Sequence, residues 1–262
     1  MIIGICVAIN GPFYHPDSFA FLEMSLNRSP LYVLFLKLFT TLFGDNYIWP
    51  LICIQFLVLV FAVHYLLKII AKQFHLHPVE TVVLQFIVLS PSIYFNYTSG
   101  AVLSEALSHP LLLIVFALGF NAFAALNIKS LLKSLIPLYF LILTKGQFIV
   151  IVPVVVALGS YIGYSLLRKN KKWLPLLLLV VLPIFINYSE RLYNKVMFGY
   201  FENNSMNYVH LITTDFYISK ASAVEIFDEP DEINYFKIVH ASLEKAGLTT
   251  QKVDAQNESV VE

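Results

Sequence analysis

The chain has 262 residues, of which 58% are hydrophobic and 13% are charged, and its formal net charge is zero. Soluble domains carry roughly 25% charged residues, so this composition does not fit an ordinary soluble domain and indicates an all-α polytopic membrane protein. The zero net charge gives no sign of a nucleic-acid partner.

Long apolar runs separated by polar breaks predict about seven membrane segments. The first is partial, because Met1–Ile9 is shorter than the ~20 residues that a spanning helix needs. The stretch 30–43 is also short and contains Lys37, which favours a helix lying along the membrane surface or re-entering it. The predicted segments lie at residues 1–10, 49–67, 79–96, 106–126, 131–144, 148–167 and 173–188.

Lysine and arginine gather in three predicted loops that lie on the same side of the membrane if the segments alternate. Because basic residues are enriched in cytoplasmic loops, we assign these three loops to the cytoplasm. The loops at 11–48, 97–105 and 145–147 then face outward. The basic residues are Lys68, Lys72, Lys129, Lys133, Arg168, Lys169, Lys171 and Lys172.

The last part of the chain has ordinary hydrophobicity and many acidic residues. We therefore predict a transmembrane bundle at 1–188, with its first outward loop at 11–48, and an outward-facing soluble segment at 189–262. In that segment, 216–219 is expected to form a strand, and 231–246 has apolar residues at helical spacing. Its polar end is expected to be truncated or partly disordered.

Two charged residues stand out in the first outward loop. Asp17 lies between Pro16 and Ser18, where it either caps the following helix or acts as a general base at the rim of a cavity. Arg28 either anchors the next helix at the membrane surface or binds phosphate oxygens through its planar guanidinium group.

Two more charged residues occupy the other outward turns. Glu105 stands at the start of the fourth segment, beside Ser104 and near His109. It is either an acid favoured by the helix dipole or an acid facing a watery cavity. Lys145 lies on the outward side, against the positive-inside bias. It is either a lysine that snorkels to the headgroups or a cation that binds a lipid phosphate.

These residues form an ordered set of short motifs along the chain. The set resembles the GT-C superfamily of polytopic glycosyltransferases, in particular the branch that contains protein O-mannosyltransferases and bacterial aminoarabinose transferases. The likeness covers about residues 1–200. The motifs are Pro16-Asp17-Ser18, Arg28-Ser29-Pro30-Leu31-Tyr32, Leu42-Phe43-Gly44, Ser104-Glu105 and Leu143-Thr144-Lys145-Gly146.

The resemblance implies a multi-pass protein of the cell membrane with its active site facing outward. It would transfer a sugar, with inversion, from a polyprenyl-phosphate carrier to a cell-surface lipid, glycan or protein. Asp17 would deprotonate the acceptor, and Glu105 would orient the acceptor or help to hold a metal. Arg28 and Lys145 would bind the lipid phosphate and stabilise the charge that develops on it.

The resemblance does not decide whether the protein uses a metal cofactor, and it implies more membrane helices than this chain shows. Parts of the superfamily use a divalent metal, whereas this sequence does not require one: His75 and His77 form an H-x-H pair without further ligands, which is a weak sign of a metal site. Members of the family usually have eleven or more membrane helices. The chain is therefore expected to be an incomplete transferase.

Two other functions remain open on the residues alone. A lipid or small-solute transporter would need polar side chains along a path across the membrane, and mid-membrane positions are mostly apolar apart from Gln55 and His64. A non-catalytic membrane subunit or an inactive fragment is the other alternative. In that case the four charged residues Asp17, Arg28, Glu105 and Lys145 would lie scattered rather than together.

Overall fold

The computed structural model of the chain describes residues 11–25, 28–94, 100–170, 174–203, 216 and 218–247. Within these ranges the chain is all-helical and contains no strand. The elements are α2 (Pro16–Leu22), α3 (Pro30–Phe43), η1 (Gly44–Asn46), α4 (Ile48–Phe74), α5 (Pro78–Tyr94), α6 (Glu105–Ala124), α7 (Ile128–Thr144), η3 (Gly146–Val150), α8 (Ile151–Asn170), α9 (Leu174–Phe198), η4 (Ala221–Ile226) and α11 (Pro230–Lys245).

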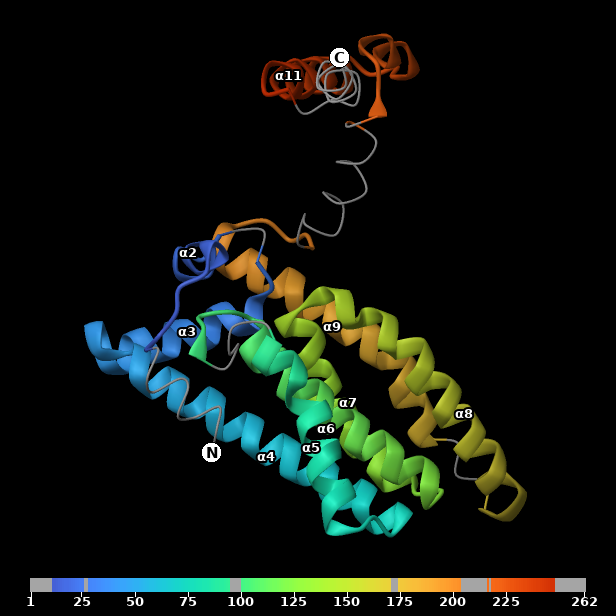
Figure 1. The fold of residues 1–262 in the computed structure, drawn as a ribbon. Helices are drawn as coiled ribbons and strands as arrows, with labels where there is room; N and C mark the ends of the chain where they lie inside the picture. The colour runs from blue at the N-terminus through green and yellow to red at the C-terminus, as the bar shows by residue number, and fades with distance from the viewer. Residues whose placement is uncertain are drawn as a thin grey trace, which may run out of the picture. The chain divides into compact units, whose positions relative to one another are not determined.

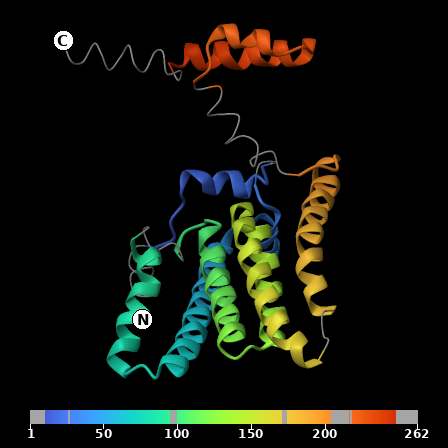
Figure 2. The ribbon, with the colours of Figure 1, turned by 90° about the vertical axis from the view of Figure 1, so that its right-hand side faces the viewer.

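The long helices α4 to α9 run side by side as a bundle (Figures 1 and 2). Helix α6 packs closely against both α4 and α7. Ala62 of α4 and Ala117 of α6 are fully buried in the same apolar cluster. Small side chains let helix backbones approach closely, which is how helices in a bilayer gain packing energy.

Three helices in the described residues are long and apolar enough to cross a membrane, as expected of an integral membrane protein. They are Ile48–Phe74, Glu105–Ala124 and Gly146–Tyr164, the last formed by η3 and the first part of α8. The apolar part of α5, Pro78–Ser92, is shorter. The predicted segment at 1–10 lies outside the described residues, and the count of about seven spans stays a prediction.

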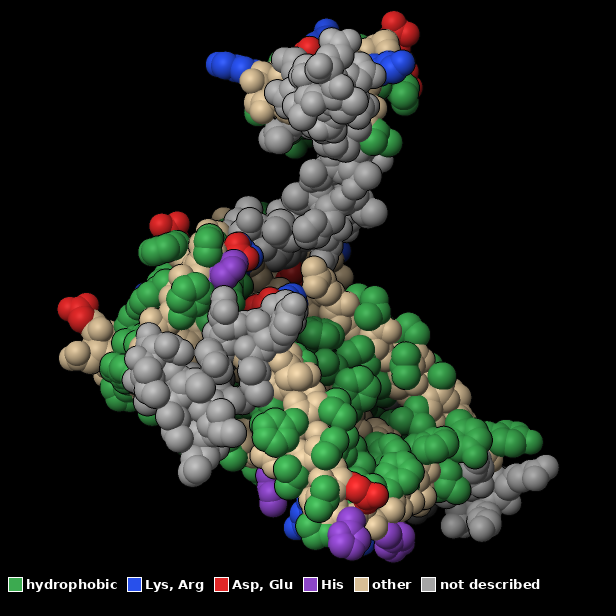
Figure 3. Space-filling model, in the orientation of Figure 1, with side chains coloured by type: hydrophobic (Ala, Val, Ile, Leu, Met, Phe, Trp, Pro, Cys, Tyr) green, Lys and Arg blue, Asp and Glu red, His purple; other side chains and the backbone are tan. Residues whose placement is uncertain are grey.

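Apolar side chains point outward from the bundle as well as inward. Val79, Val150 and Val196 are 71%, 69% and 73% exposed. Figure 3 shows hydrophobic side chains across the face that α8 and α9 form. Exposed apolar patches of this kind are rare on soluble monomers, whereas helices that are hydrophobic all round are typical of membranes.

The predicted surface or re-entrant helix at 30–43 is present as α3. At about 21 Å for 14 residues, α3 is too short to cross a hydrocarbon core of about 30 Å. Tyr32, Val33 and Leu36 bury one side of α3 in a cluster with the start of α4 and the start of α6. Leu38 and Leu42 lie exposed on the other side.

The bundle has two chemically different ends. The turn between α4 and α5, the turn between α6 and α7, and the end of α8 lie at one end (Figure 2). These are the segments at which the basic residues gather. Helix α2, the start of α6 and the end of α7 lie at the opposite end. The two ends therefore separate the basic loops from the predicted site residues, and the assignment of the basic end to the cytoplasm stays a prediction.

The chain divides into two compact units, Met1–Asn204 and Ser205–Glu262. The boundary predicted after residue 188 falls inside α9, which continues to Phe198. In the second unit, a helix is present as α11 where 231–246 has helical periodicity. The region after residue 247 lies outside the described residues.

The strand predicted at 216–219 is wrong. Phe216 and Ile218 have helical backbone conformation. A strand needs a neighbouring strand to pair its backbone groups, and the described part of this unit supplies none. Phe216 instead stacks on Phe236 of α11, with ring centroids 5.2 Å apart, which buries its aromatic face.

Candidate functional site

Asp17 lies in the first turn of α2, at the end of the bundle opposite the basic loops (Figure 2). The N-cap of α2 is His15, whose Nδ1 accepts a hydrogen bond from the Asp17 backbone N–H at 3.4 Å. The His15 N–H in turn donates to Ser18 Oγ at 2.8 Å. The alternative in which Asp17 itself caps the helix is therefore wrong. Because His15 supplies the cap, the Asp17 carboxylate is available for other partners.

Backbone pairing joins the loop before α2 to the segment that precedes α6. The Phe13 N–H donates to Gly100 O at 3.0 Å, and the Val102 N–H donates to Phe13 O at 3.1 Å. The Ser18 hydroxyl adds a third bond, donating to Val102 O at 2.7 Å. These bonds place Asp17 near the start of α6, a proximity for which the sequence carries no signal.

Asp17 and Arg28 form an ion pair. Arg28 Nη2 donates to Asp17 Oδ1 at 2.8 Å. The guanidinium carbon also lies 4.8 Å from the centroid of the Phe21 ring, an arrangement that favours a cation. The Arg28 side chain is mostly buried, while half of the Asp17 side chain is exposed. Arg28 therefore holds a carboxylate that remains accessible from outside.

Arg28 also has a donor that remains unused. Its Nε is buried and has no hydrogen-bond partner among the residues that the structure describes. Leaving a buried donor of a charged group unpaired costs free energy.

Glu105 and Lys145 form the second ion pair, with Lys145 Nζ 2.6 Å from Glu105 Oε1. Glu105 is the first residue of α6, and Lys145 directly follows the last residue of α7. The Ser104 hydroxyl donates to the other carboxylate oxygen of Glu105 at 3.2 Å. Both charged side chains are partly exposed. The pair thus joins the ends of two neighbouring helices and remains in contact with solvent.

One cavity of about 650 Å³ brings three of the four predicted residues together. Its volume is in the range of about 300–1,000 Å³ that is usual for small-ligand sites. Arg28 does not line the cavity but reaches it through its bond to Asp17. The polar lining comes from His15, Asp17, Glu105, Ser108, His109 and Lys145. The apolar lining includes Phe13, Ile87, Val88, Pro91, Leu112, Leu113 and Phe148.

The charges at this cavity balance, because each carboxylate faces a cation. An anionic ligand at Lys145 therefore competes with Glu105, and one at Arg28 competes with Asp17. A neutral hydroxyl group can approach Asp17 directly, since that side chain is exposed. The cavity has a charged rim and an apolar wall on α5, which suits an amphipathic ligand with an anionic head and a hydrocarbon chain.

His109 and Ser92 belong to this region and were not proposed as site residues from the sequence. Ser92 Oγ and His109 Nδ1 lie 2.9 Å apart, which links α5 to α6. His109 is four residues after Glu105, and residues at that spacing share one face of a helix. This spacing is the sequence signal that could have identified His109.

The polar residues of α4 lie away from this site. Gln55 is buried and donates through Nε2 to the Tyr32 hydroxyl at 3.0 Å. His64 is exposed on the outer side of α4. Neither residue lines the cavity. Among the described residues, no three histidine, cysteine, aspartate or glutamate side chains come together as metal ligands.

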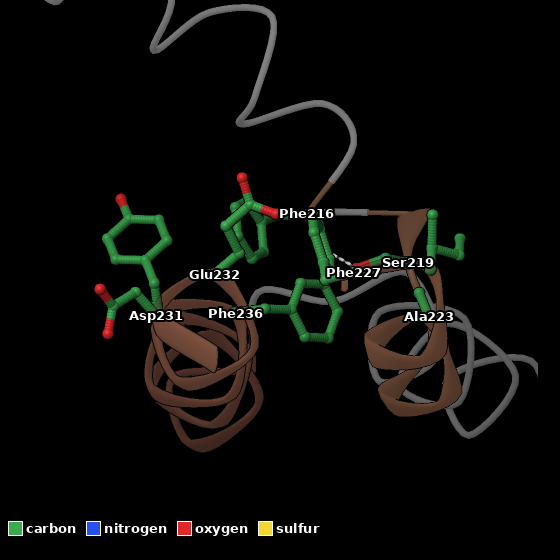
Figure 4. Close-up of a pocket in the computed structure, with 9 residues that line it drawn as sticks. Phe216, Ser219, Ala223, Phe227, Asp231, Glu232 and Phe236 are labelled. Carbon is green, nitrogen blue, oxygen red and sulfur yellow. Dashed lines mark hydrogen bonds between the residues drawn. The ribbon is translucent and has the colours of Figure 1, made fainter. Parts of the chain in front are cut away.

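A second cavity, of about 720 Å³, lies in the C-terminal unit between η4 and α11 (Figure 4). Stacked Phe216 and Phe236 form its centre, and Asp231 and Glu232 stand at its edge. None of the residues predicted to carry chemistry lines it. The cavity of the helix bundle is therefore the candidate functional site.

No protein-family model, no curated protein and no solved structure matches this chain. The likeness to GT-C transferases therefore rests on the sequence motifs alone.

Proposed function

We propose that the chain is a membrane glycosyltransferase that moves a sugar from a polyprenyl-phosphate donor to a cell-surface acceptor. The observation that carries this proposal is the shared cavity, which places Asp17, Glu105 and Lys145 at one rim and an apolar wall beside them. Arg28 adds a second cation through its bond to Asp17. A lipid-linked sugar needs all of these: cations for phosphate, apolar surface for the lipid and a base for the acceptor.

Lys145 is the first phosphate ligand in this proposal. In the unliganded chain Glu105 neutralises it. A phosphate oxygen displaces the Glu105 carboxylate, which then turns to the acceptor. The lipid chain follows the apolar wall formed by Val88 and Pro91 of α5 and Leu112 of α6. The hydrocarbon beside the phosphate thereby stays in an apolar environment.

Asp17 is the proposed general base. An acceptor hydroxyl transfers its proton to the Asp17 carboxylate as its oxygen bonds to the anomeric carbon. The bond between that carbon and the phosphate oxygen breaks, and the electron pair leaves with the polyprenyl phosphate. Lys145 and Arg28 stabilise the charge that grows on this leaving group. Attack from the face opposite the phosphate inverts the anomeric centre.

The convergence of polar groups favours a transferase over a transporter. The four charged residues meet at one end of the bundle, whereas Gln55 is engaged with Tyr32 and His64 faces outward from α4. A transporter would require polar groups along the whole membrane depth.

Transfer in membranes that contain the chain tests the proposal directly. The substrate is a polyprenyl-phosphate carrier with a radiolabelled sugar, and the measurement is label found on cell-envelope material. We expect transfer with the unmodified chain and none with Asp17→Asn. Equal transfer by the two chains would show that Asp17 is not the base. Uptake of the donor into sealed vesicles without transfer would favour transport instead.

A further inference from the structure

His109 lines the same cavity as the ion pair and lies further along α6 than Glu105. It is one helical turn, or about 6 Å along α6, beyond Glu105. Both residues line the cavity. A polar, ionisable side chain within a membrane helix carries a free-energy cost, and such residues typically face the bundle interior and contact a ligand or partner.

One ring nitrogen of His109 is engaged and the other is open. Nδ1 lies 2.9 Å from the hydroxyl oxygen of Ser92, a residue of α5 that is 1% exposed. Within the described part of the chain, Nε2 has no hydrogen-bond partner, yet it is not one of the buried unpaired atoms. Nε2 is therefore accessible from the cavity that the ring lines.

The role of Nε2 follows from the direction of the bond to Ser92, whose hydroxyl group can donate to Nδ1 or accept from it. A neutral imidazole has one donor and one acceptor nitrogen, and the partner of one nitrogen sets the role of the other. When the Ser92 hydroxyl donates to Nδ1, the ring proton resides on Nε2. Nε2 then presents an N–H group to the cavity, one turn below Lys145's partner Glu105.

We infer that His109 is a phosphate-binding residue of the cavity. This inference rests on the proposed function, because it assigns a second ligand to the same lipid phosphate. Lys145 contacts the phosphate from the rim, and His109 Nε2 donates to it from the lipid side. The pair of contacts selects a phosphate at the junction between the charged rim and the apolar wall.

If His109 has only a structural role, as a link between α5 and α6, its variants should affect binding and stability in a different pattern. Asparagine at 109 retains a hydrogen-bonding group near Nδ1 and loses the one near Nε2. Glutamine retains a group near Nε2 and loses the bond to Ser92. Ser92→Ala removes the tie and leaves the imidazole in place. These three variants separate the two ring nitrogens.

The test measures binding of farnesyl phosphate to the purified full-length chain in detergent, with farnesol as the control that lacks the phosphate. Binding is read from calorimetry and from the rise in unfolding temperature. We expect His109→Asn to weaken farnesyl phosphate binding about tenfold at an unchanged unfolding temperature of the free chain. We expect His109→Gln and Ser92→Ala to unfold at lower temperature but to bind within about threefold of the unmodified chain.

Two results would overturn the inference and leave the proposed function standing. One is full affinity in His109→Asn while Lys145→Met loses binding. The other is an equal loss of affinity in His109→Asn and Ser92→Ala. If the unmodified chain does not prefer farnesyl phosphate to farnesol, the proposed function fails and the inference with it. If His109→Asn does not fold, loss of binding in His109→Ala with retention in His109→Gln supports the role, and equal binding by these two opposes it.

Discussion

Glu105 and Lys145 lie 40 residues apart in the chain, yet Lys145 Nζ is 2.6 Å from Glu105 Oε1. The close packing of α6 against α7 brings the first residue of one helix to the residue that follows the other. The pair occupies the rim of the cavity that Asp17 also lines. It therefore keeps an acid and a cation together at the place where a phosphate and an acceptor would meet.

Removing the acid of this pair and removing its cation should have opposite effects on the affinity for an anion. Glu105→Gln removes the carboxylate that competes for Lys145, so we expect farnesyl phosphate to bind about threefold to tenfold more tightly. The same variant should lose sugar transfer, because the acid is absent. Lys145→Met should weaken binding about tenfold or more. Calorimetry on the purified chains measures both.

Lys129→Met is the matched control for Lys145→Met. Lys129 is an exposed residue in the first turn of α7, at the other end of that helix. Its loss should leave farnesyl phosphate binding unchanged. Weaker binding in both lysine variants would indicate a general effect of charge rather than a site.

Asp17→Asn should abolish sugar transfer and leave membrane insertion and folding intact. Amide nitrogen and oxygen cannot take the proton from the acceptor. The Asp17 side chain is half exposed, and asparagine retains an oxygen that can accept the hydrogen bond from Arg28 Nη2, so we expect only a small loss of stability. The measurements are the transfer rate and the unfolding temperature. Glu23→Gln, which changes another exposed acid at the end of α2, should transfer normally, and an equal loss there would argue against a specific base.

Ser18→Ala should displace the loop that carries Asp17. The Ser18 hydroxyl, in a fully buried residue, accepts from the His15 N–H and donates to Val102 O, so its loss leaves a partly buried donor and a buried acceptor without that partner. We expect a destabilisation of about 1–3 kcal/mol and a lower transfer rate. Ser29→Ala provides the comparison, because the Ser29 side chain makes no capping bond at the start of α3. If the two serine variants have the same free energy of unfolding in denaturant, the hydrogen bonds of Ser18 do not stabilise the fold.

Tyr32 should make the folded chain sensitive to alkaline pH. Burial raises the pKa of Tyr32 far above its ordinary value of 10.0, although the hydrogen bond from Gln55 opposes this shift. The unfolded chain releases the phenol proton above about pH 10, whereas the folded chain retains it. Stability is therefore unaffected below about pH 10 and falls as the pH rises above it, by up to about 1.4 kcal/mol per pH unit.

Unfolding experiments between pH 9 and about pH 11 check this expectation. Tyr32→Phe should show a shallower loss of stability over that range than the unmodified chain. Tyr188→Phe, which alters an exposed tyrosine of α9, should retain the steep loss. Parallel slopes for the unmodified chain and Tyr32→Phe would show that Tyr32 does not hold its proton in the folded state.

The helices follow closely from the sequence. The stretch 30–43 and α3 have the same bounds, and α4, α5 and α6 begin within one residue of the predicted segments. Runs of apolar residues and the prolines at helix starts carry this information locally. The strand predicted at 216–219 is wrong because its β-type residues are used for aromatic packing against α11. Local propensity does not include such tertiary contacts.

The sequence by itself determined a chain of apolar helices with a few charged residues placed between them. It identified Asp17, Arg28, Glu105 and Lys145 because isolated charges are conspicuous in an apolar chain. Only the tertiary structure decided that these four form two ion pairs, that three of them share one cavity and that His109 lines the same cavity. The reason is physical: hydrophobic periodicity is a property of neighbouring residues, whereas ion pairs and cavities depend on how distant helices pack.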